Sequence, residues 1–89
     1  MLYSLALSTV QILSKNLRSL RQRRGLTQVQ VAEAAALDYK HYQRLEGSDW
    51  PGVRLDTVDR LAEALRVPTW ELLRPPPDET KMHQTPESK

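Results

Sequence analysis

The stretch TQVQVAEAAALDYKHYQRLEG, residues 27–47, decides how this chain is expected to fold. Its first half is small and apolar, whereas its second half crowds aromatic, basic and amide side chains together. Thr27 and Asp38 belong to the residue types that cap helix N-termini, and Gly47 belongs to the type that ends helices. The stretch therefore predicts two short helices separated by a turn of about four residues.

The side chains of these two helices divide into an inward and an outward set. Ala32 and Ala35 are small enough to let the helices cross closely. The inward positions are expected to be Val31, Ala32, Ala35, Leu37, Tyr42 and Leu45. Positions 39, 40, 43 and 44 then fall on the outer face of the second helix, where a DNA major groove could admit them. This arrangement is typical of a helix-turn-helix.

The apolar spacing before this stretch is also helical. Residues recur at intervals of three and four at Val10, Leu13, Leu17 and Leu20. Ser14 is a candidate N-cap, so a helix over 14–24, ended by Gly25, is predicted. Segment 1–13 has no charged side chain. Its pattern permits either an extension of the helix or a short strand.

The chain after residue 47 is predicted to hold two more helices and a tail. SDWPGVR, residues 48–54, is expected to be a loop because of its Ser-Asp and Pro-Gly pairs. Asp56 or Thr57 is expected to cap the first of these helices, and Thr69 to begin the second. The inward positions of the first are expected to be Val58, Leu61, Ala62 and Leu65. Residues 74–89 are Pro-rich and polar, which predicts a disordered tail.

The length of 89 residues fits one small domain. Charge is distributed unevenly along it. Residues 14–54 carry eight basic and four acidic side chains, a balance of +4, whereas residues 55–89 carry five and seven, a balance of −2. A positive first half is the expected footprint of a surface that binds a polyanion, although a solvated basic face would look the same. The absence of Cys excludes a disulfide framework and a thiolate zinc site.

The apolar N-terminus is not expected to be a targeting or membrane segment. It lacks a basic region at its start, its apolar run is interrupted by polar residues, and no cleavage site follows. It is also too short and too polar to span a bilayer. We therefore expect a cytoplasmic, nucleoid-associated protein without a membrane partner.

Two longer stretches carry a family resemblance. They are LRSLRQRRGLTQVQVAEAAALDYKHYQRLEG, residues 17–47, and LDTVDRLAEALRVPTWELL, residues 55–73. Together they resemble the lambda-repressor-like, XRE-type helix-turn-helix family, over about residues 16–73. The resemblance implies an all-α fold, a bundle of five helices with a central helix-turn-helix, for residues 14–73.

The resemblance also implies roles for individual residues. The positions that reach base edges match Tyr39, Lys40 and Arg44, with Gln43 reaching a base or a phosphate. Phosphate contacts match Gln28, which also braces the recognition helix, and Arg54. His41 is expected near phosphate, because no second metal ligand lies at a suitable spacing. Arg21 and Glu46 match a buried ion pair. Lys or Arg can pair with guanine, and Gln with adenine.

Two residues depart from the family pattern. Ala36 stands at a turn position where the family usually has Gly and where positive φ is often needed. Alanine adopts that conformation at a cost of about 1–2 kcal/mol, or else the turn differs. Tyr42 replaces a β-branched aliphatic anchor, and its hydroxyl is expected to need an exit from the core.

These observations predict a sequence-specific transcriptional regulator that binds a palindromic operator as a homodimer, with residues 38–46 in the major groove. The dimer contact is expected at the final helix, with segment 1–13 as a further candidate. The alternatives are an antitoxin or adaptor whose main partner is a protein such as a toxin, and a non-specific nucleic-acid binder. No cofactor, metal site or enzyme is predicted, because no nucleophile, base and orienting group are recognisable.

Overall fold

The computed structural model describes residues 7–49 and 52–75 of the chain. These residues form the helices α2 (Thr9–Arg23), α3 (Gln28–Ala34), α4 (Tyr39–Glu46), α5 (Leu55–Leu65) and α6 (Thr69–Leu73). The all-α, five-helix architecture is therefore confirmed for the described part of the chain. Residues 1–6 of the apolar N-terminus, Trp50 and Pro51 of the predicted loop, and residues 76–89 of the predicted tail lie outside the described residues.

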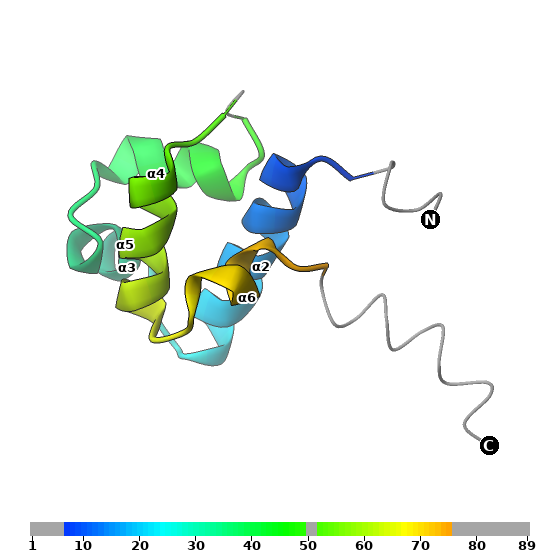
Figure 1. The fold of residues 1–89 in the computed structure, drawn as a ribbon. Coiled ribbons are helices and arrows are strands. Elements are labelled where there is room, and N and C mark those ends of the chain that lie inside the picture. Colours follow the sequence, from blue (N-terminus) through cyan, green and yellow to red (C-terminus); the bar gives the residue numbers. More distant parts are fainter. Residues whose placement is uncertain (1–6, 50–51, 76–89) are drawn as a thin grey trace, which may run out of the picture.

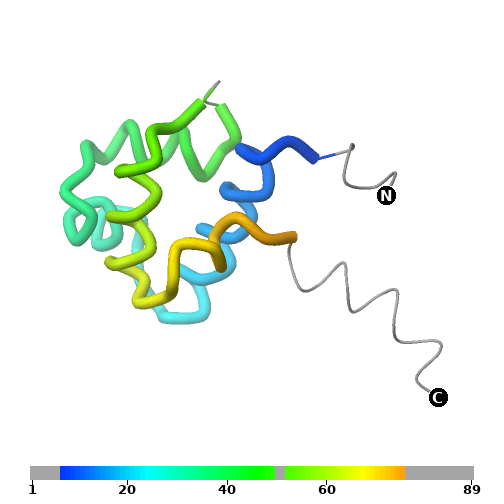
Figure 2. The backbone as a smooth tube through the Cα atoms, viewed as in Figure 1, coloured from blue at the N-terminus to red at the C-terminus, as the bar shows by residue number. Residues whose placement is uncertain are grey.

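The helices are arranged as a ring, which Figure 1 and Figure 2 show. α2 packs against α4 and α6, α3 packs against α4 and α5, and α5 packs against α6. Each helix therefore has two principal neighbours. α4 is held from two sides, by α2 and by α3, which fixes its orientation.

The core lies inside this ring and consists of aliphatic side chains and one aromatic ring. Its buried members are Leu13, Leu17, Leu20, Val31, Ala32, Ala35, Tyr42, Leu45, Val58, Leu61, Ala62, Leu65 and Leu72. The predicted inward positions of α3, α4 and α5 are buried or, for Leu37, packed against the core. Ala32 and Ala35 are buried where α3 meets its neighbours, as expected for small residues at a close helix crossing.

The start of α2 differs from the prediction. Ser8, not Ser14, is the N-cap, and it forms a capping box with Gln11, in which each side chain bonds the other residue's backbone N–H. The segment 9–13 is thus a helix extension. Ser14 lies inside the helix, is buried, and donates its hydroxyl hydrogen to the backbone carbonyl of Leu45. It therefore joins α2 to α4.

The start of α5 also differs from the prediction. Arg54 occupies the N-cap position and makes no side-chain capping bond, so neither Asp56 nor Thr57 is the cap. Both lie in the first turn of the helix instead. Thr57 is buried, and Asp56 pairs with Arg54. By contrast, the caps predicted at Thr27 and Asp38 are confirmed, as is the start of α6 at Thr69.

Four helices end in the same way, with a residue at positive φ one or two positions after the last helical residue. These residues are Gly25, Ala36, Ser48 and Arg66. In each case two backbone N–H groups bond back to carbonyls of the last turn, which is the Schellman motif. Helix α4 ends before Gly47, as predicted, but the positive φ falls on Ser48.

Candidate nucleic-acid interface

The outer face of α4 presents the residues that were predicted to read bases. Tyr39, Lys40, Gln43 and Arg44 are all exposed. Their exposure follows from the helical period, because Tyr42 and Leu45 are fully buried on the opposite face. The structure thus gathers hydroxyl, ammonium, amide and guanidinium groups on one surface, and these are groups that can bond base edges and phosphates.

The C-terminal end of α4 is anchored by the carboxylate of Glu46, whose side chain is only 3% exposed. Arg21 from α2 donates to both of its oxygens, with Nε 2.5 Å from Oε2 and one terminal nitrogen 3.1 Å from Oε1. Tyr42 Oη donates to Oε2 at 2.5 Å, and Gln28 Nε2 donates to Oε1 at 2.9 Å. Each carboxylate oxygen therefore accepts two hydrogen bonds. A single side chain ties α2, α3 and α4 together.

These contacts shift the titration of the groups involved. Burial alone would raise the pKa of Glu46, but hydrogen bonds from Arg21, Tyr42 and Gln28 to the charged form outweigh it, so the pKa is lowered. Burial and then the Glu46 carboxylate raise the pKa of the Tyr42 hydroxyl. The hydrogen bond to Glu46 raises the pKa of Arg21. The cluster thus holds a carboxylate, a guanidinium and a neutral phenol.

The hydroxyl of Tyr42 corrects one expectation from the sequence. It does not leave the core, because Glu46, one helical turn further along α4, accepts its hydrogen bond inside. The signal was present in the sequence as the i, i+4 spacing of these two residues. Breaking this buried cluster by removing one partner is expected to be strongly destabilising, since it leaves the remaining groups without their bonds.

A chain of hydrogen bonds links the buried carboxylate to the exposed face of α4. Gln43 Nε2 lies 3.5 Å from Gln28 Oε1 and 2.9 Å from the hydroxyl oxygen of Tyr39, and it donates to both. Gln28 is half-buried at the start of α3, where it bonds Glu46. Gln28 therefore braces α4, as the resemblance implies, through Glu46 and Gln43. The bond between Tyr39 and Gln43 was not predicted, although the i, i+4 spacing of these two residues on α4 permits it.

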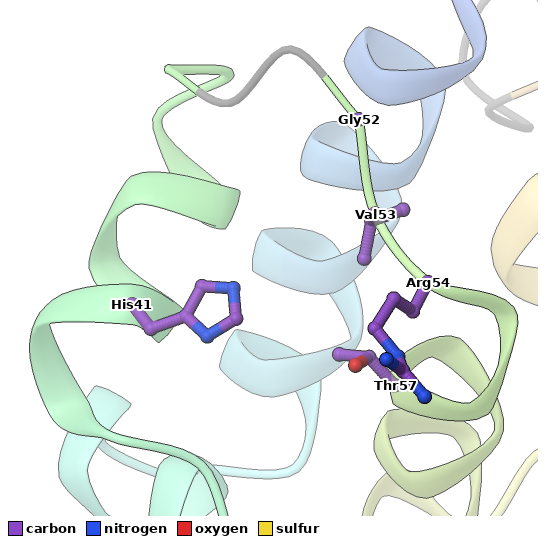
Figure 3. Close-up of a pocket in the computed structure, with 5 residues that line it drawn as sticks. All are labelled: His41, Gly52, Val53, Arg54 and Thr57. Atoms are coloured by element: carbon purple, nitrogen blue, oxygen red, sulfur yellow. The ribbon is translucent and has the colours of Figure 1, made fainter.

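His41 and Arg54 lie on opposite sides of an open cleft of about 410 Å³. His41 comes from α4, and Gly52, Val53, Arg54 and Thr57 line the facing segment. Figure 3 shows the imidazole of His41 pointing toward the side chains of Arg54 and Thr57. The structure therefore brings together two of the residues predicted to bind phosphate, at the start of α5.

Two exposed ion pairs accompany these basic side chains. Arg44 Nε lies 3.6 Å from Asp49 Oδ2, and Arg54 Nε lies 3.0 Å from Asp56 Oδ1. Pairs of this kind contribute little to stability, so either arginine can exchange its carboxylate for a phosphate or a base. Neither pairing was predicted from the sequence, because each depends on the turns that follow α4 and precede α5.

Neither a metal site nor a membrane-spanning helix is present in the described residues. No group of three or more potential ligands there is placed to hold a metal ion. Within residues 7–49 and 52–75, no helix has the length and apolar character needed to cross a membrane.

A family model described as a helix-turn-helix domain matches residues 12–74, most of the chain. The chain therefore belongs to the helix-turn-helix domain family. The match confirms the prediction, made from the resemblance, that the chain is a helix-turn-helix DNA-binding domain and not an enzyme.

One relative is a protein of Neisseria meningitidis serogroup B named as a hypothetical transcription factor. It is 30% identical over 71 residues, which cover 80% of this chain and 66% of the relative. This chain thus spans just under two thirds of that relative's length.

Two solved structures are similar in fold and sequence. The crystal structure of the hypothetical transcription factor NHTF from Neisseria has a TM-score of 0.76 and 28% identity, covering 84% of this chain and 85% of that one. The restriction-modification controller protein C.AhdI from Aeromonas hydrophila has a TM-score of 0.67 and 30% identity, covering 71% and 94% respectively.

Proposed function

We propose that this protein is a sequence-specific transcriptional regulator that reads DNA by placing α4 in the major groove. The observation that carries the proposal is the outer face of α4, where Tyr39, Lys40, Gln43 and Arg44 are exposed together on a helix anchored from behind by Glu46. A rigid mount matters because a bidentate base contact depends on the orientation of the side chain. The names of the two similar solved proteins, a hypothetical transcription factor and a restriction-modification controller protein, support the same class.

The remaining predicted contacts fit a backbone-binding role beside α4. In this proposal Gln28, His41 and Arg54 contact phosphates and set the position of α4 along the duplex. His41 and Arg54 flank the cleft between α4 and the start of α5, so one phosphate could lie between them. Gln28 lies at the start of α3, where backbone N–H groups favour an anion.

The proposal includes a homodimer on a palindromic operator. One α4 offers few base contacts, so a second copy on a neighbouring half-site adds the specificity that one copy lacks. Half-sites would lie about one helical turn apart, roughly 34 Å. Trp70 on α6 is 61% exposed and supports a contact between copies at that helix. The proposal also includes a location in the cytoplasm, where the protein would be associated with the nucleoid.

Selection of bound sequences from random duplexes, followed by titration at two salt concentrations, tests this function. A palindromic consensus is the expected result. Affinity without any preferred sequence would indicate non-specific binding, and no measurable affinity would favour an antitoxin or adaptor with a protein partner. Either outcome would contradict the proposal.

Variants separate base reading from phosphate binding in the same assay. Lys40→Ala and Arg44→Ala should each relax the preference at a defined base, by about 1–3 kcal/mol of discrimination. Arg54→Ala should instead weaken binding to all duplexes alike and reduce the salt dependence by about one ion. An unchanged consensus for both α4 variants would show that these two residues do not read bases.

A further inference from the structure

The carboxylate of Glu46 fixes the direction of the hydrogen bonds that lead to the outer face of α4. An ionised carboxylate only accepts hydrogen bonds, so the Gln28 amide must turn its nitrogen toward it. The other amide atom, Gln28 Oε1, is then directed at Gln43. Because that oxygen also only accepts, the Gln43 amide must in turn present Nε2. A buried charge thus sets the orientation of an exposed amide.

The same logic determines what the exposed end of this chain offers. The two N–H bonds of Gln43 are directed at Gln28 Oε1 and at the hydroxyl oxygen of Tyr39. Gln43 Oε1 takes no part in these bonds and keeps its capacity to accept. The Tyr39 hydroxyl accepts from Gln43 and keeps its own hydrogen as a donor. The outer face of α4 therefore offers one acceptor beside one donor.

We propose that Tyr39 and Gln43 form one reading unit for a single adenine, with the Tyr39 hydroxyl donating to N7 and Gln43 Oε1 accepting from N6. Glu46 is the positioning residue for this unit. Adenine is the base whose major-groove edge sets an acceptor beside a donor, whereas guanine offers two acceptors, thymine one acceptor and cytosine one donor. The unit differs from an ordinary Gln–adenine pair, in which a single amide supplies both bonds.

This inference rests on the proposed function, because it requires α4 to enter the major groove. Its test therefore starts from the full chain and a duplex carrying the selected consensus. Each adenine of a half-site is replaced in turn by 7-deazaadenine, which lacks N7, or by purine, which lacks the N6 amino group. At one adenine, each replacement should weaken binding about threefold to tenfold, the range expected for one hydrogen bond.

The protein variants identify the partner of each base atom through a double-mutant cycle. Tyr39→Phe should bind the adenine duplex about as weakly as the wild type binds the 7-deazaadenine duplex, and should lose nothing more on that duplex. Gln43→Ala should behave in the same way toward purine. Lys40→Ala is the control, and it should leave both losses at this adenine unchanged. If the 7-deazaadenine loss persists in Tyr39→Phe and disappears in Gln43→Ala, the amide reads adenine alone and the proposal is overturned.

Glu46→Gln tests the positioning role. An amide at position 46 can donate to Gln28 Oε1, which reverses the Gln28 and Gln43 amides and removes the acceptor from the outer face. The ratio of affinities for the adenine and purine duplexes should then fall from about threefold or more to near one. Tyr42→Phe is the matched control, because it removes another bond to the same carboxylate. It should lower the melting temperature but leave that ratio unchanged.

The outcomes distinguish this inference from the function beneath it. If the wild type selects no consensus, the proposed function fails, and the reading unit fails with it. If a consensus appears but no adenine in it is coupled to Tyr39, only the reading unit is wrong. If Glu46→Gln does not fold, the cycle with Tyr39→Phe still decides the proposal. A folded Glu46→Gln that keeps the wild-type ratio would contradict the role of Glu46.

Discussion

Ala36 holds the turn between α3 and α4 in a conformation that its own side chain disfavours. Its φ is 58°, in the left-handed region, where a Cβ atom crowds the following carbonyl oxygen. The turn keeps this geometry because the N–H of Ala36 bonds Glu33 O and the N–H of Leu37 bonds Ala32 O. Leu37 also packs against the core. The strain is therefore offset by two backbone bonds and one apolar contact.

Ala36→Gly is expected to stabilise the protein. Removing Cβ relieves about 1–2 kcal/mol of strain, while the greater freedom of glycine in the unfolded chain costs about 0.5–1 kcal/mol. The net gain should be on the order of 0.5–1 kcal/mol, which raises the melting temperature by a few degrees. Thermal unfolding followed by circular dichroism measures the melting temperature.

Ala34→Gly, in the last turn of α3 at ordinary helical φ, is the control and should lower the melting temperature. A loss in both variants would mean that the turn carries no strain.

Single residues also show where sequence reasoning stops. The positive φ of Ala36 could be expected from the family pattern, because glycine usually stands there. The positive φ of Ser48 could not be expected, because the preceding residue, Gly47, is of the type that usually adopts positive φ after a helix. Whether the helix ends one residue earlier or later depends on how α4 packs, and no local signal reports that.

At the scale of helices, most of the fold could be predicted because it depends on local rules. Apolar periodicity identified the buried faces of α3, α4 and α5, and cap chemistry identified the starts of α3 and α4. The start of α2 was predicted wrongly because both Ser8 and Ser14 are followed by apolar residues at helical spacing, so either could be the N-cap. The Ser-x-x-Gln pattern at Ser8 and Gln11 was the local signal that separates them.

The contacts between helices could not be predicted from local rules, because they join residues that are distant in the chain. The Arg21–Glu46 pair was expected from the family resemblance and from no local rule. Ser14 of α2 bonds Leu45 of α4, and Gln28 of α3 bonds Glu46 and Gln43 of α4. A polar side chain at an inward position can be noticed in a sequence, but its partner depends on the final packing. The candidate site was therefore predicted as a set of residues, and its hydrogen bonding came from the structure.

Helix α6 depends on one such distant contact. It has five residues and no side-chain cap. The buried side chain of Asn16 in α2 donates to the carbonyls of Leu72 and Arg74, at 2.8 Å each, and so satisfies the C-terminal end of α6. A helix this short has little stability of its own, so its position follows from Asn16 and from the burial of Leu72.

Asn16→Asp should detach α6 from the bundle. The carboxylate has nearly the same shape but cannot donate, and it would face two carbonyl oxygens in a buried place. A loss of about 2–5 kcal/mol in the free energy of unfolding is expected, measured by urea denaturation. Gln22→Glu makes the same change of charge at an exposed position of α2 and should alter stability by less than about 0.5 kcal/mol. Equal effects would show that charge, and not the bond to α6, is responsible.

Over the whole molecule, the proposed reading surface and the proposed dimer contact lie on different elements. The base-reading residues lie on α4, while Trp70 lies on α6, and α2 packs between these two helices. Figure 1 shows α6 crossing α2 away from α3. Trp70 is 61% exposed, and the guanidinium of Arg74 lies 5.6 Å from the centroid of its ring. An exposed aromatic side chain with an arginine beside it is the kind of pair that is enriched at the centres of protein interfaces.

Trp70→Ala should therefore weaken self-association while leaving the fold intact. Truncation of an aromatic anchor at an interface typically costs at least about 2 kcal/mol, which is roughly thirtyfold in the dimer Kd. Sedimentation across a dilution series measures this constant, and the melting temperature of the dilute monomer should change little because the side chain is mostly exposed. Leu55→Ala, which removes a side chain of 74% exposure from α5, is the matched control and should leave the constant unchanged.

In DNA titrations, Trp70→Ala should bind a single half-site like the wild type and lose affinity only for the full palindrome, because the second copy then no longer binds cooperatively. Equal losses on the half-site and on the palindrome would place Trp70 at the DNA instead.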